Sequence, residues 1–425
     1  MARSVFCTIA LLLASAFAVG QTQETILWLF SGHYNGDGSG PRGRLILDGQ
    51  GNLYGTTTSG GSSANCFGFG GLGCGTVFEL SPNSDGSWSE TRLHSFDLYD
   101  GAFPQAGLVM DSAGNLFGTT GDGGEPTCAD KNGCGAVFEL SPPSAPGGVW
   151  TFSDLYFFCF HQTGCPDGSV PVSDLTMDTH GNLYGTTSSG GVRDGGTVFE
   201  LSNRSGNWIK TTLYNFCSAG QRPVCPDGWK PLAGVAFDRS GNLYGTTSLG
   251  GSNTYDGGGV VYKLSPAATG EWIETVVYAF STFCTQGCMP TGDVVFGPAG
   301  DLYGTLQIGG QGGGIFRLNL GNRGNEFTFF SPAGDGTLPT AAILLDPLSH
   351  TFYGTASRGG GTGAGTVFTI VGNQATVLYD FCSQLDCADG SVPLGSLIED
   401  KQGNLYGTTS LGGDVGGGVV FALSP

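Results

Sequence analysis

Six aspartates recur in one short motif and are the first candidates for chemistry in this chain. Each begins the pattern Asp-Gly-x-x-Pro, at Asp37, Asp100, Asp167, Asp227, Asp335 and Asp389. A ring of such carboxylates could bind a cation such as Ca²⁺ or accept hydrogen bonds from glycan hydroxyl groups. Asp-Gly is also a common turn dipeptide, whose carboxylate accepts hydrogen bonds from nearby backbone N–H groups. A residue that recurs in nearly every unit usually has a structural role in that unit. We therefore favour capping of the loop over ligand binding as the role of these aspartates.

Four further residues interrupt the regularity of these segments. His161 precedes Asp167, and Arg222, Trp229 and Lys230 surround Asp227. An aromatic ring beside charged groups suits stacking on a sugar, and a histidine near an aspartate could act in acid–base catalysis. Ordinary surface or loop packing is the alternative for each. The sequence contains no Gly-x-Ser-x-Gly, His-Glu-x-x-His, phosphate-loop or EF-hand motif, so it assigns no catalytic residue.

The N-terminal segment has the features of a secretory signal peptide. Arg3 supplies the basic start of residues 1–20, an apolar stretch follows, and small residues near Ala18 form a cleavage site. We therefore expect a protein secreted from the cytoplasm, with an uncleaved N-terminal anchor as the alternative.

The cysteines beyond this segment fall into six neighbouring pairs. They are Cys66/Cys74, Cys128/Cys134, Cys159/Cys165, Cys217/Cys225, Cys284/Cys288 and Cys382/Cys387. An even number of cysteines after a signal peptide predicts disulfides formed in an oxidising compartment. Proximity favours pairing between neighbours. A metal-ligand role for Cys284/Cys288 is the alternative there, but no histidine or second cysteine pair accompanies it.

A repeat organises the remaining chain. Gly-Asn-Leu-Tyr-Gly-Thr-Thr and its variants occur seven times, and a Gly-Gly pair follows each central aromatic residue six positions later. These aromatics are Tyr54, Phe117, Tyr184, Tyr244, Tyr303, Tyr353 and Tyr406. Each unit contains four short strand-like runs, of which the first follows a proline, as in Pro104 to Asp111. No sustained helical periodicity is present.

Seven units of four antiparallel strands predict an all-β fold, a seven-bladed β-propeller that forms a single domain over residues 21–425. Stacked blades bury both faces of each sheet, so the Tyr-Gly-Thr run should place a large and a small residue on opposite sides. Residues 25–30 resemble a fourth strand, and the chain stops just after a third-type strand. We therefore expect residues 25–30 to complete the seventh blade and close the ring.

Composition limits the functional classes. The 425 residues include 78 glycines and 20 prolines, yet 11% are aromatic, which argues against disorder. The formal net charge is −19 and no run of Lys or Arg is present, so nucleic acid and anionic membranes are poor partners.

The string Gly-Asn-Leu-Tyr-Gly-Thr-Thr-x-x-Gly-Gly, followed by Gly-Thr-Val-Phe-Glu-Leu, resembles the GloVer tandem repeat of bacterial choice-of-anchor proteins. A weaker similarity links the units to kelch propellers. The resemblance implies an extracellular propeller and brings no catalytic residues. The family often carries a C-terminal sorting domain, whereas this chain ends at Pro425 without an anchor, which implies free release or periplasmic residence.

All six cysteine pairs lie in two kinds of connection, fourth strand to first and second strand to third, which emerge on one face of a propeller. We call this the stapled face. Binding residues tend to occupy loops held by a rigid scaffold. We therefore expect a secreted or periplasmic monomer that binds a polysaccharide or an envelope protein through the stapled face. A glycan-cleaving enzyme acting on the same face and a structural exterior protein without a ligand are the alternatives.

Overall fold

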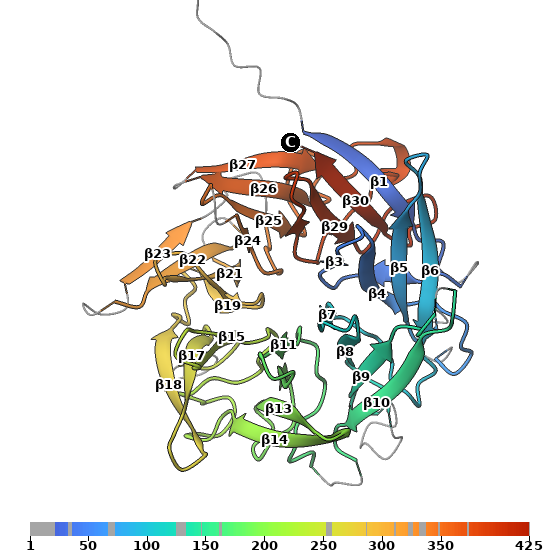
Figure 1. Cartoon of the computed structure of the whole chain (residues 1–425). Coiled ribbons are helices and arrows are strands. Elements are labelled where there is room, and N and C mark those ends of the chain that lie inside the picture. Colours follow the sequence, from blue (N-terminus) through green and yellow to red (C-terminus); the bar gives the residue numbers. More distant parts are fainter. Residues whose placement is uncertain are drawn as a thin grey trace, which may run out of the picture.

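The computed structural model describes residues 22–32, 36–66, 73–124, 133–145, 147–160, 164–251, 257–285, 287–309, 312–321, 326–330, 337–346, 349–371 and 374–424. The predicted signal peptide lies outside these residues. Seven antiparallel sheets surround a central axis (Figure 1). The predicted seven-bladed β-propeller is confirmed.

Each blade runs from an inner strand at the axis to an outer strand at the rim. Blade 1 contains β2 (Ser39–Pro41), β3 (Ile46–Leu47), β4 (Leu53–Ser59), β5 (Thr76–Pro82) and β6 (Trp88–Ser95). Blade 2 contains β7 (Val109–Met110), β8 (Leu116–Thr120), β9 (Ala136–Ser141) and β10 (Thr151–Phe157). Blade 3 contains β11 (Thr176–Met177), β12 (Leu183–Thr187), β13 (Thr197–Arg204) and β14 (Asn207–Asn215).

The remaining blades follow the same plan. Blade 4 contains β15 (Ala236–Phe237), β16 (Leu243–Thr247), β17 (Val260–Pro266) and β18 (Trp272–Ala279). Blade 5 contains β19 (Cys288–Pro290), β20 (Val295–Phe296), β21 (Leu302–Ile308), β22 (Gly314–Asn319) and β23 (Glu326–Phe330). Blade 6 contains β24 (Leu344–Leu345), β25 (Phe352–Ala356), β26 (Thr366–Val371) and β27 (Gln374–Asp380). Blade 7 contains β28 (Ile398–Glu399), β29 (Leu405–Thr409), β30 (Val419–Ser424) and β1 (Gln23–Leu29). A three-residue 3₁₀ turn, η2 (Leu385–Cys387), precedes blade 7.

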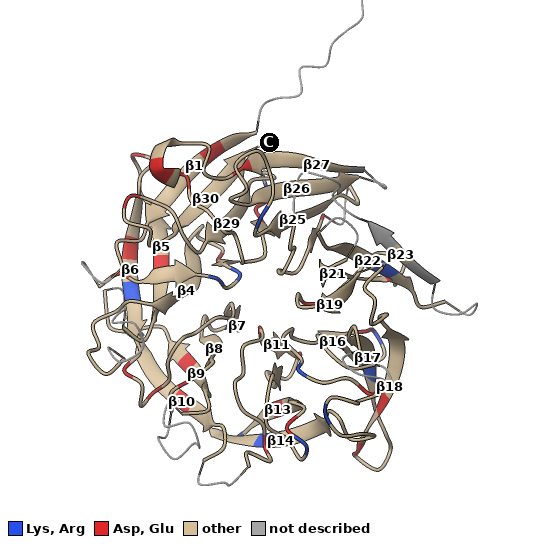
Figure 2. Cartoon of the chain, turned by 180° about the vertical axis from the view of Figure 1, so that it is seen from behind, with Lys and Arg blue, Asp and Glu red and all other residues tan. Residues whose placement is uncertain are grey.

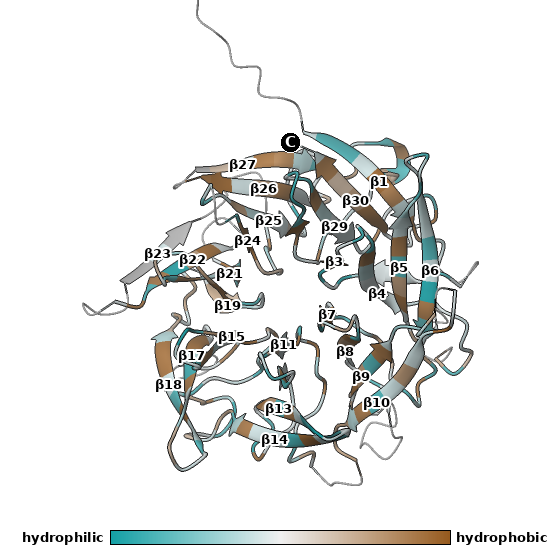
Figure 3. Cartoon of the chain, viewed as in Figure 1, coloured by the Kyte–Doolittle hydropathy of each residue, from teal (hydrophilic) through white to brown (hydrophobic). Residues whose placement is uncertain are grey.

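The glycine of each second strand lies beneath an aromatic ring of the third strand. In blade 1, Gly55 pairs with Phe78, and a Cβ on Gly55 would lie 2.6 Å from the ring. The equivalent pairs in the other blades repeat this contact. They are Gly118/Phe138, Gly185/Phe199, Gly245/Tyr262, Gly304/Phe316, Gly354/Phe368 and Gly407/Phe421. All residues of β8, β12 and β16 are buried, which confirms that both faces of these sheets are covered. Figure 3 shows hydrophobic segments in the third strands of the blades, such as β5 and β30, and also in the outer strands β18 and β27.

In five of the seven blades, the first threonine of the second strand connects neighbouring blades. Thr56 Oγ1 donates to the carbonyl of Ala106 at 2.8 Å, and Thr186 Oγ1 donates to Ala233 at the same distance. The acceptor lies two residues after the loop proline of the next blade. Thr119, Thr305 and Thr355 make the same bond, whereas the hydroxyls of Thr246 and Thr408 are buried without a hydrogen-bond partner.

The inner strands are shorter than the predicted runs. The run from Pro104 to Asp111 contributes only the two-residue β7 to its sheet. The residues just after the proline bend because neighbouring blades nearly touch there: a Cβ on Gly43 would lie 2.4 Å from the carbonyl oxygen of Ala106. The bent segments face the axis instead of pairing.

The ring closes as predicted. β1 pairs antiparallel with β30, from Gln23 opposite Ser424 to Leu29 opposite Val419 (Figure 1). Phe30 then packs edge-to-face on Phe78 of blade 1, with ring centroids 5.1 Å apart. The N-terminal strand thus joins the last blade to the first. Among the described residues, no helix has the length and apolar character needed to cross a membrane.

Gly55→Ala tests the contact between glycine and aromatic ring. The added methyl group would collide with Phe78 and Leu45, so we expect the free energy of unfolding to fall by roughly 1–3 kcal/mol. Gly49→Ala is the matched control, because a Cβ there meets no atom within 4 Å. Denaturant titration of both variants measures the difference, and equal midpoints would contradict the packing argument.

Deleting residues 22–30 tests ring closure. The deletion removes the buried side chains of Leu27 and Phe30, each worth roughly 2–5 kcal/mol, and exposes the edge of β30. We expect a lower melting temperature and aggregation, while Thr25→Ala, at an exposed position of β1, should melt like the wild type. An unchanged melting temperature after the deletion would rule out a closing role for β1.

Candidate functional site

Five disulfides join described cysteines on the stapled face. They are Cys66–Cys74, Cys159–Cys165, Cys217–Cys225, Cys284–Cys288 and Cys382–Cys387. Each matches a predicted neighbour pair. Cys284 and Cys288 form a disulfide, so the alternative in which these two cysteines bind a metal is wrong. The sixth predicted pair includes Cys128, which lies outside the described residues.

The loop aspartates cap the start of their own loops. The carboxylate of Asp227 accepts hydrogen bonds from the Tyr214 hydroxyl at 2.8 Å and from the Ser218 backbone N–H at 2.7 Å. Asp389 binds Tyr379 and Ser383 in the same way. The others accept from the corresponding positions: Asp37 from Ser31, Asp100 from His94 and Asp97, and Asp167 from Tyr156 and Cys159. These contacts match the predicted capping role.

The described aspartates do not converge on one point. Each binds groups beside the outer strand from which its loop starts, and Asp335 lies outside the described residues. Within the described part of the chain, the one group of three side chains close enough to share a metal is Cys134, Cys159 and Cys165, two of which form a disulfide. Ca²⁺ held by the aspartate ring stays an untested prediction.

A second carboxyl group faces most of these caps from the outer strand of the following blade. The pairs are Asp37 with Glu90, Asp100 with Asp154, Asp227 with Glu274, and Asp389 with Glu24. Burial, and then the neighbouring aspartate, raise the pKa of Glu24, Glu90 and Glu274 to about 7 and that of Asp154 to about 6. Lys210 occupies this place beside Asp167, and burial lowers its pKa to about 8.

The loop between blades 3 and 4 brings three of the predicted residues together. The guanidinium carbon of Arg222 lies 5.2 Å from the ring centroid of Trp229, and its Nη2 binds Asp194 Oδ2 at 2.6 Å. Trp229 is half-buried and its indole N–H has no hydrogen-bond partner. Lys230 follows with an exposed side chain, while its backbone N–H donates to the carbonyl of Gly195 at 2.8 Å. His161 lies outside the described residues.

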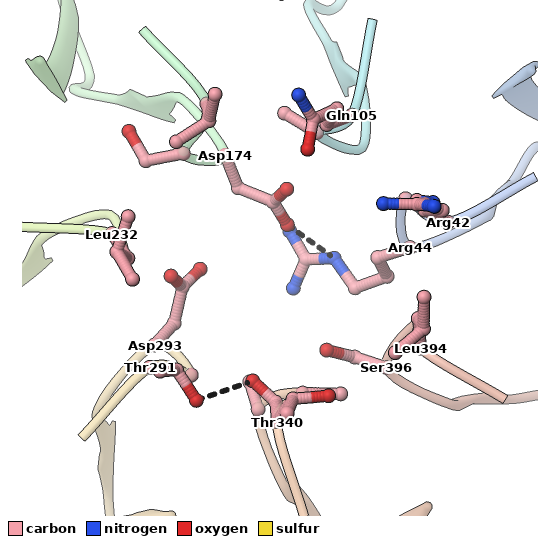
Figure 4. Close-up of a pocket in the computed structure, with 17 residues that line it drawn as sticks. Arg42, Arg44, Gln105, Asp174, Leu232, Thr291, Asp293, Thr340, Leu394 and Ser396 are labelled. Carbon is pink, nitrogen blue, oxygen red and sulfur yellow. Dashed lines mark hydrogen bonds and ion pairs between the residues drawn. The ribbon is translucent and has the colours of Figure 1, made fainter. Parts of the chain in front are cut away.

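A pocket of about 120 Å³ lies on the central axis, and we call it the axial pocket (Figure 4). It is lined by residues one to three positions after the loop proline, from all seven blades. Trp229 lies three residues before Leu232, which lines the pocket from blade 4. The loops of the stapled face therefore lead directly into the pocket wall.

Three blades place charged side chains three positions after the proline: Arg44, Asp174 and Asp293. The other four blades have Gly107, Gly234, Ala342 and Ser396 at this position.

Backbone N–H groups of the small residues hold the two carboxylates. Asp174 Oδ1 accepts from the N–H of Gly107 in blade 2, and Asp293 Oδ1 accepts from that of Gly234 in blade 4, both at 2.6 Å. Each aspartate is thus held by the blade that precedes it.

The charges in the axial pocket are incompletely paired. Arg44 Nε lies 3.7 Å from Asp174 Oδ2, beyond hydrogen-bond distance, and is buried without a hydrogen-bond partner. Burial, followed by the charge of Asp174, raises the pKa of Asp293 to about 7, against the opposing effects of Arg44 and the Gly234 N–H. The carboxyl group of Asp293 is therefore partly protonated near neutral pH.

None of the axial side chains was predicted from the loop motif. A difference between the repeats identifies Arg44, Asp174 and Asp293. When the seven units are aligned on the loop proline, these charged residues occupy a position at which the other four units have Gly, Ala or Ser. Asp194 was also missed, because it lies 28 residues from Arg222 and is identified only by the folded structure.

The outer carboxyl groups make stability depend on pH. Raised pKa values mean that the folded chain binds these protons more tightly than the unfolded chain does. The stability that these carboxyl groups contribute by binding protons is complete below the unfolded pKa, near 4. It is lost as pH rises through the folded pKa values of 6 to 7. We expect a higher melting temperature at pH 5 than at pH 7.5, with about 1 kcal/mol per group after allowing for exposure.

Glu274→Gln, which removes one of these titrations, should flatten the dependence, and Glu271→Gln at an exposed position should not. Calorimetric scans between pH 5 and pH 7.5 measure the melting temperature of the wild type and of both variants. A melting temperature that rises from pH 5 to pH 7.5 would contradict the argument.

Comparison with solved structures finds similar folds at low sequence identity. A candidate 6-phosphogluconolactonase from Bacteroides fragilis has a TM-score of 0.49 at 14% identity, over 85% of this chain and 94% of that one. An ulvan lyase, a polysaccharide lyase, has a TM-score of 0.48 at 10% identity, over 94% and 95% of the two chains. A protein of unknown function from Dyadobacter fermentans has a TM-score of 0.45 at 11% identity, over 95% and 99%. No curated protein sequence matches significantly.

A family model gives a more specific result. The model described as the Gloeobacter/Verrucomicrobia repeat matches residues 131–293 and 231–425. These ranges overlap over residues 231–293 and together span more than half of the chain, in agreement with the resemblance of the repeat motif. The chain therefore belongs to the Gloeobacter/Verrucomicrobia repeat family.

Proposed function

We propose that this protein is an extracytoplasmic binding module that recognises a polysaccharide through the stapled face and the axial pocket. The observation that carries this proposal is the set of charged side chains in the pocket. Four of the seven blades have Gly, Ala or Ser three positions after the proline, so the fold does not require charge there. Incompletely paired charged groups on a rigid scaffold are typical of ligand sites.

The surroundings of the pocket support a glycan as the ligand. Trp229 is half-buried and offers an aromatic surface with Arg222 against its ring. Sugars combine apolar ring faces with many hydroxyl groups, and this combination suits an aromatic ring beside charged groups. Disulfides keep the adjoining loop in one shape, which lowers the entropic cost of binding. The disulfides are also consistent with an oxidising, extracytoplasmic location.

Glycan cleavage is the second candidate function, and one observation favours it. Asp174 and Asp293 point into the same pocket (Figure 4), and burial followed by the charge of Asp174 raises the pKa of Asp293 to about 7. A protonated and an ionised carboxyl group are the usual requirements for glycoside hydrolysis. Binding is the simpler proposal because Arg44 lies beside one carboxylate and backbone N–H groups hold both.

A polysaccharide panel separates the candidates. The purified protein is passed over immobilised neutral and acidic polysaccharides, and retention and new reducing ends are measured together. Retention without new ends supports a binding module, new ends support an enzyme, and neither result supports a structural exterior protein.

Trp229→Ala tests the aromatic surface. Loss of stacking should weaken retention roughly 2- to 12-fold, which corresponds to about 0.5–1.5 kcal/mol. Tyr99→Ala is the control, because Tyr99 is an exposed aromatic in a different loop of the stapled face. Equal effects of the two substitutions, or no effect of Trp229→Ala, would contradict a specific role for the loop between blades 3 and 4.

A further inference from the structure

We propose that the axial pocket binds the carboxylate-bearing unit of an acidic saccharide, a hexuronate. Arg42 and Arg44 would bind the carboxylate, and the two pocket aspartates would accept hydrogen bonds from ring hydroxyl groups. The inference rests on the proposed function and names the ligand class of the same site.

The donors for an anion are in place and unused. Arg42 is exposed and makes no hydrogen bond or ion pair with any described residue, and the Nε of Arg44 is buried without a hydrogen-bond partner. A guanidinium group presents a planar set of N–H donors that fits a carboxylate in two parallel hydrogen bonds. Figure 2 shows basic segments reaching the central opening beside β4, while acidic residues mark the outer strands. Two of the 16 Lys and Arg residues of an acidic chain thus line its axis.

Acceptors for hydroxyl groups lie in the same pocket. One oxygen of Asp174 and one of Asp293 bind backbone N–H groups, which fixes both carboxyl groups. A carboxylate oxygen has more than one lone pair, so both side chains can accept further bonds. Thr340 Oγ1, which also lines the pocket, is buried without a hydrogen-bond partner. Ring hydroxyl groups of a sugar can satisfy each of these positions.

Charge and size select a uronate over other small ligands. A phosphate dianion would lie beside two carboxyl groups, and the repulsion would offset its attraction to the arginines. A neutral sugar would leave the exposed guanidinium group of Arg42 without an anion, whereas the carboxylate of a uronate can bind it. The pocket volume of about 120 Å³ is smaller than the roughly 150 Å³ of a cavity that holds benzene. The pocket therefore takes the carboxylate and the adjoining hydroxyl groups of one acidic unit, with the rest of the glycan outside on the stapled face.

Isothermal titration of the full secreted protein tests the inference at pH 7. The probes are glucuronate, galacturonate, glucose and inorganic phosphate. We expect at least one uronate to bind at least about tenfold more tightly than glucose or phosphate, because charge-assisted bidentate bonds are the strongest available. The R42Q/R44Q variant should lose at least about tenfold in uronate affinity. R193Q, an exposed position in the connection between β12 and β13, makes a similar charge change outside the pocket and should bind like the wild type.

A melting transition shows that each variant is folded. If the R42Q/R44Q double variant does not fold, the single variant R42Q replaces it in the binding measurements. Equal binding of glucose and both uronates, tighter binding of phosphate, or unchanged uronate affinity in a folded arginine variant would overturn the inference. Retention of polysaccharides without uronate binding would overturn the inference and leave the proposed function intact. Uronate binding without retention of any polysaccharide would support the pocket assignment and overturn the proposed function.

Discussion

The contact between the second-strand glycine and the third-strand aromatic ring is the constraint on which the rest of this propeller depends. The ring fills the space that a side chain on the glycine would occupy, which leaves no void between neighbouring blades. The adjacent threonine then reaches the next blade, as Thr56 does when it binds the carbonyl of Ala106. This carbonyl lies within the bent segment that lines the axial pocket. The repeat motif therefore positions the pocket wall, although it contributes no side chain to the pocket.

The same constraint explains why the pocket side chains can vary. The bent segments pair with the sheet over only two residues. A threonine hydroxyl of the neighbouring blade donates a hydrogen bond to one of their backbone carbonyl groups and so fixes their position. The side chains one and three positions after the proline are not needed for that bond. At one of these positions a glycine of one blade can pair with an aspartate of the next, as Gly107 does with Asp174. A glycine leaves space for the carboxylate and donates the hydrogen bond that holds it.

The fold could be predicted from the sequence because every blade repeats the same local chemistry. Ring closure followed from the types of the first and last strands, and the disulfides from the short spacing of the cysteines. Capping by Asp227 was also foreseen, because Asp-Gly turns act through local bonds. The site could be predicted only in part. Arg222 and Trp229 were identified, but their partner Asp194 comes from another loop, and Arg44 and Asp293 occupy a position that recurs without a common residue type. Residues that recur in every repeat identify the scaffold. The side chains that differ from the repeat pattern are identified only when the repeats are compared position by position.

The two sets of carboxyl groups respond to pH with the same sign. Glu274 is part-buried beside Asp227, so protonation removes the cost of burying its charge, and then the repulsion from Asp227, and stabilises the ring. In the axial pocket, protonation of Asp293 leaves Arg42 and Arg44 with less competition from a protein carboxylate. A uronate remains ionised in mildly acidic solution, because its own carboxyl group titrates near the ordinary carboxyl pKa of about 4. Mild acidity therefore favours the closed ring and would also favour the proposed uronate at its axis, so stability and the proposed binding do not oppose each other.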